Sequence, residues 1–301
     1  MERERLPQTE AQTVAYCRRA FAARLAALRE AAIQLVVPRH GETKKLPPRS
    51  HFHLEPEMFV QVSGKTIFQC PKDNFPLTPG GVCVVPRRVR HFERALPHAG
   101  KPFANIVVMC LPDRLALHIA DATADGRPKG VVGFALEPAS LSTRMAAHLD
   151  DLAEAAHGVL ESHATLAEAL LGAALALLVA AIDTHKPDHR QENYKVRQCK
   201  VMVASNLSDP ELSVAKLAEW IRCAPDYLSH LFHKESGQKL VAYINQQRMT
   251  HAMDLLKTTS LNVSEVATTC GFEDQGYFTR LFRRVVGETP TTHRRLHQPT
   301  Q

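Results

Sequence analysis

The 301-residue chain has little of several features that define specialised classes of protein. Only 6% of its residues are aromatic, it holds one Trp, and its longest apolar run, residues 170–182, is thirteen residues long. A bilayer requires about 20 apolar residues, so this run predicts a buried helix and we expect no membrane partner. Residues 1–5 carry mixed charge and no apolar run follows them, so we also expect no signal peptide.

The cysteines exclude a disulfide-bonded scaffold. There are seven, an odd number, their spacings are wide, and no Cys-x-x-Cys occurs. This favours reduced, mostly buried thiols and a cytoplasmic location. Neither sign of charge is scarce, since 37 Lys and Arg stand against 31 Asp and Glu, a net charge of +6. The 45% of hydrophobic residues is ordinary for a globular protein, and the length suggests two domains.

Three regions of the chain differ in their patterns. Residues 9–35 place apolar side chains at spacings of three and four, which predicts a helix. In residues 36–136, prolines and glycines separate short apolar runs, which predicts the strands of a sandwich or barrel. Residues 139–185 are helical in pattern again, and the polar residues 183–193 contain a Pro and predict a linker. Helical patterns then continue almost to the end.

The last hundred residues contain an internal repeat. Residues 212–218 (LSVAKLA) align with residues 261–267 (LNVSEVA) at an offset of 49. Residues 227–232 (YLSHLF) align with residues 277–282 (YFTRLF) at an offset of 50. Each copy predicts a helix, a short turn and a second helix. The second helix of the second copy is expected to bury Phe278, Leu281, Phe282 and Val285.

Local signals place the helix ends of both copies. Ser213 is a candidate N-cap, and Pro225 suits the first position of a helix. In the second copy, Asn262 with Glu265 resembles a capping box, and Gly271 lies where a tight turn needs a positive φ. A plain helical bundle with a duplicated hairpin is the alternative interpretation. The short turns favour the steep crossing of a helix-turn-helix instead.

The exposed face of each second helix carries side chains that suit base edges and phosphates. The candidate DNA contacts are Asp226, Ser229, His230, His233 and Lys234 in the first copy and Gln275, Thr279, Arg280, Arg283 and Arg284 in the second. Residues 239–257 predict one connecting helix, about 28 Å long at 1.5 Å per residue. Successive major grooves lie about 34 Å apart, so this helix could set both units into adjacent grooves. From Lys195 onward, fourteen Lys and Arg stand against ten Asp and Glu, a net charge of +4.

On these motifs, residues of about 195–296 resemble the AraC/XylS family of bacterial transcription regulators. The residues that carry the resemblance include 225–237 (PDYLSHLFHKESG), 248–256 (RMTHAMDLL) and 271–282 (GFEDQGYFTRLF). The resemblance implies two helix-turn-helix units that bind asymmetric DNA sites beside a sensing or dimerising N-terminal domain. The first unit departs from the family, with Arg222 in place of the usual Gly and Ala224 in place of a capping Ser. We therefore predict that the first unit is locally softer than the second.

The strand-rich region contains a second constellation. His51, His53 and Glu57 share one parity on an extended chain, and His91 lies in another predicted strand. Three imidazoles and a carboxylate suit a divalent transition metal such as Zn, Fe, Mn or Ni. The pattern resembles the two motifs of cupins, small β-barrels that bind a metal at these four positions. Here Gly41 is unusually far from His51, Arg88 replaces a Gly and Ala95 an Asn. A polar pocket without a metal is the alternative.

Together these patterns predict an α+β multidomain protein. Residues 1–136 are expected to form an N-terminal helix and a cupin-like, effector-binding β-barrel, and residues 137–186 dimerisation helices and the start of a linker. Residues 187–301 are expected to form the rest of the linker and an all-α, DNA-binding domain with two helix-turn-helix units. The expected function is transcription regulation without enzymatic activity. The expected partners are double-stranded DNA, a small-molecule effector, a second copy of the chain and RNA polymerase. The alternatives are a metal-dependent cupin enzyme fused to a DNA-binding domain and a DNA-repair protein, which would need a reactive Cys.

Overall fold

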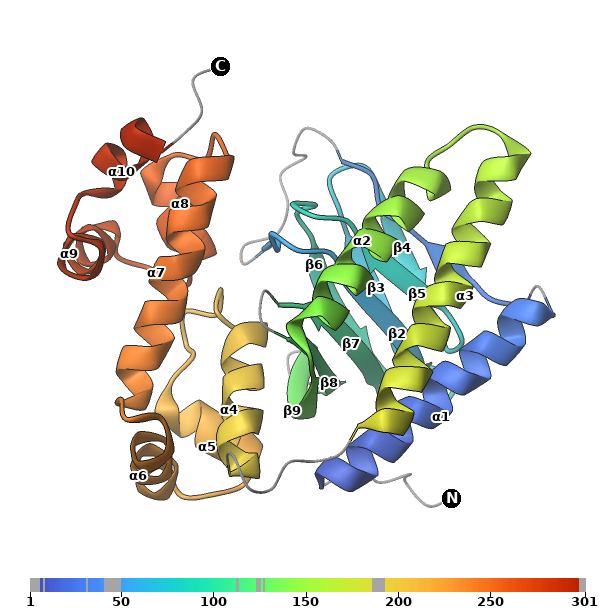
Figure 1. The fold of residues 1–301 in the computed structure, drawn as a ribbon, viewed down its shortest axis with the longest axis horizontal. Coiled ribbons are helices and arrows are strands. Elements are labelled where there is room, and N and C mark those ends of the chain that lie inside the picture. The colour runs from blue at the N-terminus through green and yellow to red at the C-terminus, as the bar shows by residue number, and fades with distance from the viewer. Residues whose placement is uncertain are drawn as a thin grey trace. The chain divides into compact units, whose positions relative to one another are not determined.

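The computed structural model describes residues 6–7, 9–30, 32–40, 50–111, 114–122, 126, 128–185 and 193–297. The chain divides into two compact units, Met1–Val201 and Met202–Gln301 (Figure 1). The limits expected at residues 136 and 186 remain predictions. Residues 186–192 of the expected linker, and Gly41 of the cupin pattern, lie outside the described residues.

The first unit is rich in strands, as predicted. A six-stranded sheet has the order β1-β5-β2-β7-β8-β9, and a three-stranded sheet has the order β4-β3-β6. The strands are β1 Leu35–Val36, β2 Glu57–Ser63, β3 Lys65–Gln69, β4 Asn74–Leu77, β5 Val82–Val85, β6 Phe92–Leu96, β7 Ala104–Cys110, β8 Leu115–Ala122 and β9 Pro128–Leu136. Only β1 and β5 pair in parallel among these strands. The described strands thus form two sheets that are not closed into one barrel.

The side chains of β2 alternate between two faces and show how the two sheets are layered. Met58 and Val60 are fully buried in the core that the six-stranded sheet shares with helices. The alternate residue Phe59 points to the other face, where its ring meets that of Phe68 on β3 edge to face, with 5.2 Å between the ring centroids. Thr66 on β3 donates a hydrogen bond to the side chain of Gln61. The six-stranded sheet is therefore covered on both faces, by helices on one and by the smaller sheet on the other.

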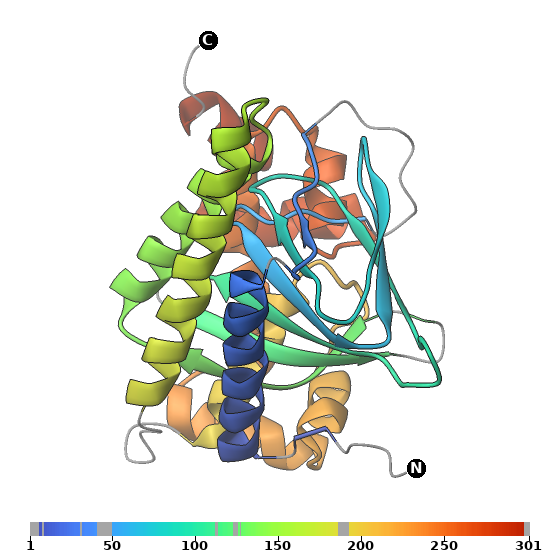
Figure 2. The same cartoon turned by 90° about the vertical axis from the view of Figure 1, so that its right-hand side faces the viewer.

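Three helices cover the outer face of the six-stranded sheet: α1 Glu10–Arg29, α2 Ala139–Ala156 and α3 Glu161–Thr184. Helices α1 and α3 lie side by side there (Figure 2). Thr9 and Gln12 form a capping box at the start of α1. The helix is shorter than the predicted 9–35, because residues 35–36 pair with β5 instead.

Among the described helices, α3 alone is long and apolar enough to cross a membrane. Helices in the core of a globular protein can have the same length and composition. The most apolar stretch of α3 is 33% buried. Leu171, Leu175 and Leu178 are fully buried in the core between α3, the other helices and the sheet. On its outer side, Leu166 is 49% exposed and small side chains such as Ala173 are exposed.

The remaining helices continue to residue 297. They are α4 Tyr194–Ser205, α5 Val214–Ile221, α6 Pro225–Ser236, α7 Leu240–Thr258, α8 Val263–Thr269, α9 Gln275–Val286 and α10 Pro290–His297. The second unit has its own aromatic core, in which Phe232, Phe278 and Phe282 are fully buried. Six of the seven cysteines are buried and Cys223 is partly buried, which confirms the prediction of mostly buried thiols.

Candidate functional site

The first helix pair is α5 and α6, with a turn of three residues between them. The Ser213 hydroxyl accepts a hydrogen bond from the Lys216 amide, so the predicted N-cap is confirmed. Arg222 ends α5 in the left-handed region, with φ +56°. Ala224 holds the N-cap position of α6 without a side-chain acceptor, and Pro225 is the first residue of the helix. Both departures from the family pattern thus fall at the turn.

The second helix pair is α8 and α9. Asn262 and Glu265 form the predicted capping box, with reciprocal hydrogen bonds of 2.7 and 2.9 Å. Gly271 has φ +78°, and a Cβ there would lie 2.5 Å from the carbonyl oxygen of Leu207. Asp274 caps α9 by accepting from the Tyr277 amide at 2.8 Å. Every helix end of this pair that the sequence placed is therefore confirmed.

The two pairs are joined by α7, a single helix of 19 residues, as predicted. Its Arg248 is 7% exposed and donates hydrogen bonds to the carbonyl oxygens of Leu207 and Asp209 at 3.1 and 2.7 Å. The guanidinium carbon lies 5.2 Å from the centroid of the Phe272 ring. Burial lowers the pKa of Arg248, and nearby Cys270, Asp209 and Tyr277 oppose that shift. This buried arginine ties the connecting helix to the segment before α5 and to the turn of the second pair.

The structure places the predicted DNA contacts on the outer faces of α6 and α9. Ser229 and Thr279 are half-buried, and the other eight residues of the set are exposed. Val285, predicted to be buried, is 48% exposed, so that prediction is wrong. Tyr227 and Tyr277, 49% and 44% exposed, lie in repeat-related positions at the starts of the two helices. The sequence analysis missed them as surface residues, although their alignment at the offset of 50 was visible.

The predicted metal ligands lie close together in the strand-rich part of the chain. His51 and His91 pair backbone to backbone, with hydrogen bonds of 3.0 and 2.8 Å. One ligand-capable nitrogen from each of His51, His53 and His91 lies within 4.8 Å of the other two. Oε2 of Glu57, the first residue of β2, lies 3.4 Å from Nε2 of His53 and 3.9 Å from Nε2 of His91. The four side chains predicted as metal ligands thus form one cluster.

The electrostatics of this cluster are those of a buried site. Burial raises the pKa of Glu57 to about 8; His91 opposes the shift and Glu93 adds to it. Burial lowers the pKa of His91, but a hydrogen bond and the charge of Glu93, with that of Glu57, outweigh it and leave the pKa raised. Glu93 was missed by the sequence analysis; its Oε1 lies 3.5 Å from Nε2 of His91. Arg88 adopts φ +59°, in the left-handed region that favours Gly.

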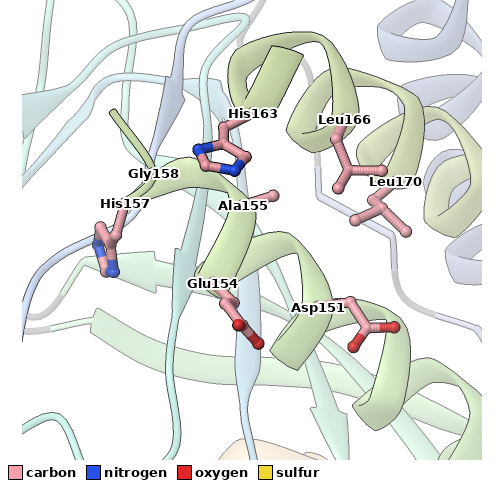
Figure 3. Close-up of a pocket in the computed structure, with 8 residues that line it drawn as sticks. All are labelled: Asp151, Glu154, Ala155, His157, Gly158, His163, Leu166 and Leu170. Carbon is pink, nitrogen blue, oxygen red and sulfur yellow. The ribbon is translucent and has the colours of Figure 1, made fainter. Parts of the chain in front are cut away.

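A separate hollow lies at the turn between α2 and α3 (Figure 3). Its volume is about 600 Å³, and Asp151 and Glu154 approach it from α2 while His163, Leu166 and Leu170 approach it from α3. None of the predicted site residues lines this hollow. It therefore belongs to neither constellation.

The geometry of the second unit defines a class: two helix-turn-helix pairs joined by one helix. Residues 197–296 match the family described as helix-turn-helix domain. The chain is 31% identical over 106 residues to the arabinose operon regulatory protein of Escherichia coli (strain K12), which covers 35% of this chain and 36% of that protein. It is 34% identical over 95 residues to the transcriptional activator RhaR of Escherichia coli O1:K1 / APEC, with 32% and 33% covered.

The chain spans about a third of the length of these curated relatives. Among solved structures, the C-terminal domain of the response regulator yesN from Fusobacterium nucleatum is 32% identical, with a TM-score of 0.32, and covers 32% of this chain and 93% of that chain. The C-terminal region is thus a helix-turn-helix domain of the AraC type, and the predicted class of this region is confirmed.

Proposed function

We propose that the protein is a sequence-specific, DNA-binding transcription regulator whose two recognition helices, α6 and α9, enter adjacent major grooves. The observation that carries this proposal is the duplicated helix-turn-helix pair on one rigid connector. Helix α7 has 19 residues and is therefore about 28 Å long, close to the groove repeat of about 34 Å. The relatives named as regulators support the same function. The residues proposed to contact DNA are those predicted on α6 and α9.

The test of this proposal is selection of bound sequences from a pool of random DNA. Because α6 and α9 carry different side chains, the enriched sites should hold two unlike half-sites about 10 base pairs apart. A pool that shows no enrichment after repeated rounds, with or without cell extract as a source of effector, would contradict sequence-specific binding. Binding should fall steeply with salt, because phosphate contacts release counterions.

The first unit is proposed to bind a small-molecule effector between its two sheets. Asn105 on β7 is fully buried, and neither polar atom of its side chain has a hydrogen-bond partner among the residues that the structure describes. Gln61 and Thr66 lie in the same interior and bond to each other. Buried polar groups are almost always paired, so an unpaired amide favours a polar ligand. An effector regulates DNA binding only if it binds two states of the protein with different affinity.

The cluster of His51, His53, His91 and Glu57 is proposed to hold a divalent transition metal, Zn, Fe, Mn or Ni. The donor set fits such an ion, and binding would give the buried Glu57 carboxylate a positive partner. A bound metal would supply a Lewis-acidic contact for the effector. Elemental analysis of tag-free protein tests this, with one metal ion per chain fewer expected in His53→Ala than in the parent. A low metal content that is unchanged in that variant would contradict the proposal.

A metal-dependent enzyme is the second candidate, because the raised pKa of Glu57 beside three imidazoles is also typical of catalytic sites. Turnover separates the two candidates. Consumption of oxygen by metal-loaded protein with a candidate substrate would favour the enzyme. A metal-loaded protein whose DNA affinity responds to a compound that it leaves chemically unchanged would favour the regulator, which is the function proposed here.

The active form is proposed to be a cytoplasmic homodimer that contacts RNA polymerase. The outer side of α3 offers a contact surface, because Leu166 and the small side chains of Ala169, Ala173, Ala176 and Ala180 on it are exposed. Ala173→Glu should convert a dimer to a monomer in light scattering. The exposed Ala26 on α1 provides a matched control, and Ala26→Glu should leave the dimer intact. A parent protein that is monomeric at tens of micromolar would contradict the dimer.

A further inference from the structure

Two imidazoles and a carboxylate lie close together at the junction between α9 and α10. The side chains are Glu288, in the turn after α9, and His293 and His297, one helical turn apart on α10. Nδ1 of His293 lies 2.6 Å from Oε1 of Glu288, and Nδ1 of His297 lies 3.8 Å from the same oxygen. One ligand-capable atom of each residue lies within 4.8 Å of the other two. These residues belong neither to the proposed DNA contacts nor to the His51 cluster.

These distances suit tetrahedral zinc. With Zn–N and Zn–O bonds of about 2.0–2.1 Å, neighbouring ligand atoms in a tetrahedron are about 3.4 Å apart. The two distances to Glu288 lie on either side of that value, so movements of the more exposed Glu288 and His297 side chains toward the buried His293 would complete the geometry. The rings of His293 and His297 are stacked, with 4.2 Å between their centroids. Nδ1 of His297 also lies 3.0 Å from the backbone carbonyl oxygen of His293, so metal binding would exchange that hydrogen bond for the ion.

Packing alone is a poor explanation for His293. Its ring is 3% exposed and stands edge to face against Phe282, with centroids 5.6 Å apart. Nε2 has no hydrogen-bond partner within the part of the chain that the structure describes. A buried, unpaired ring nitrogen costs free energy that an apolar ring of similar size would avoid. A binding role for Nδ1 would account for an imidazole at this position, although coordination through Nδ1 does not itself pair Nε2.

A further acid, Asp254 on α7, lies close enough to His293 to interact with it electrostatically. Burial raises the pKa of Asp254 on α7, while Lys257 and His293 oppose that shift, so the carboxyl group and the imidazole are electrostatically coupled. Histidines that bind metals usually direct their other ring nitrogen toward a carboxylate or carbonyl, which fixes the ring. Asp254 does not bond to Nε2 in this structure, so it would have to move toward the ring to give such support.

The geometry points to a divalent metal site of zinc type, formed by Glu288, His293 and His297, with the fourth position open to water. The His297 side chain is 44% exposed and that of Glu288 23%, so an ion can enter from solvent. The bound ion would connect the α9–α10 turn to two successive turns of α10. It would thereby stabilise the end of the second helix-turn-helix unit. The site does not depend on the proposed DNA binding.

The experiment uses the full-length, tag-free chain with His51→Ala and His53→Ala, so that the cluster of the first unit does not contribute. Zinc is titrated against a competing chromophoric chelator, and cobalt provides the absorption bands of a tetrahedral site. We expect one zinc per chain and a melting temperature that rises with zinc. Adding His297→Ala or Glu288→Gln should weaken zinc binding by about tenfold or more and remove the rise in melting temperature.

The control is His98→Ala in the same background, because His98 is an exposed imidazole outside both clusters. It should leave the zinc affinity unchanged. His297 and Glu288 are chosen because neither is fully buried, so their variants should fold. Zinc binding that is absent in the background protein, or equal with and without His297, would overturn the site. DNA binding of the same proteins in excess chelator is measured separately, so a failure of the regulator proposal is distinguishable from a failure of the metal site.

Discussion

The two helix-turn-helix units share one plan and differ at equivalent positions. Where the second unit has Gly271 in the turn, the first has Arg222, and both residues adopt positive φ. Where the second unit has Asp274 as an N-cap that accepts from a backbone amide, the first has Ala224. The first unit therefore has an L-residue in a conformation that favours Gly, and it has no side-chain cap on its recognition helix.

The exposed faces differ as well. The candidate contact face of α9 carries three arginines, whereas that of α6 carries one lysine and two histidines. A guanidinium is always charged and can make two parallel hydrogen bonds to guanine or phosphate. The second helix-turn-helix unit is thus the more basic, and we expect it to be the more stable, because the first has a left-handed Arg222 and no side-chain cap on α6. We infer that the second unit provides most of the electrostatic affinity for DNA.

The largest expected effect is that of Gly271→Ala. The new Cβ would lie 2.5 Å from the carbonyl oxygen of Leu207 and 2.8 Å from the Arg248 guanidinium, at φ +78°. Left-handed strain costs about 1–2 kcal/mol, and displacement of backbone in a packed region costs about 1–3 kcal/mol more. We expect a loss of about 3 kcal/mol in the free energy of unfolding, measured in urea by circular dichroism.

Gly287→Ala is the matched control for that measurement. Gly287 has φ +94°, but a Cβ there meets no atom within 4 Å. This variant should therefore show the strain alone, a loss of about 1–2 kcal/mol. Equal losses in the two variants would mean that the close approach of Leu207 and Arg248 to the second turn contributes nothing.

The next effect compares the two recognition helices through Arg280 and His230, which occupy equivalent positions. Arg280→Ala should weaken DNA binding by about 1–3 kcal/mol, because an arginine can hold two acceptors at once. His230→Ala should weaken it less. Binding to a set of base-substituted operators distinguishes the role of Arg280: loss of preference at one position indicates base contact, and uniform weakening with a smaller salt slope indicates phosphate. A larger loss for His230→Ala would reverse the assignment of the more basic helix as the stronger one.

The sequence was most informative where structure is local. Caps such as Ser213 and Asn262 were predictable, because each depends on a few neighbouring residues, whereas the special position of Arg222 was indicated only by the family resemblance. Val285 was wrongly predicted to be buried, since periodicity does not indicate how far along α9 its packing partners extend. It lies in the last turn of the helix, 48% exposed.

The candidate sites of the strand-rich part of the chain, Met1–Val201, were harder to predict. His51, His53, Glu57 and His91 could be identified by spacing, yet Glu93 was missed, although residues 91 and 93 share one face of an extended chain. The unpaired Asn105 could not have been found, because its surroundings depend on how two sheets pair and pack over long separations in sequence. The order β1-β5-β2-β7-β8-β9 is of that kind. Nothing in the local sequence specifies it.

The third prediction acts on the strain in the first turn. Arg222→Gly places the residue type that tolerates φ +56° at the end of α5. Removal of left-handed strain exceeds the extra entropy that Gly gives to the unfolded chain, so we expect a gain of about 1 kcal/mol. The single Trp, Trp220, lies in α5 and is 6% exposed, so its fluorescence reports this unit during unfolding. An unchanged or lower midpoint would show that Arg222 compensates for its strain elsewhere.

The smallest effect is expected from Ala224→Ser, which restores a cap on α6. Ala224 has φ −68° and ψ 141°, the extended conformation of an N-cap, so a serine hydroxyl could accept from a backbone amide of the first turn without any movement of the chain. An N-cap serine is worth about 0.5–1 kcal/mol relative to alanine. The midpoint of unfolding followed by Trp220 fluorescence should rise accordingly. Asp274→Ala is the reciprocal change in the second unit and should lower stability by a similar amount, because it removes the bond from the Tyr277 amide. If Ala224→Ser gives no rise while Asp274→Ala gives a loss, the difference between the two units does not come from their caps, and Arg222 alone would account for a softer first unit.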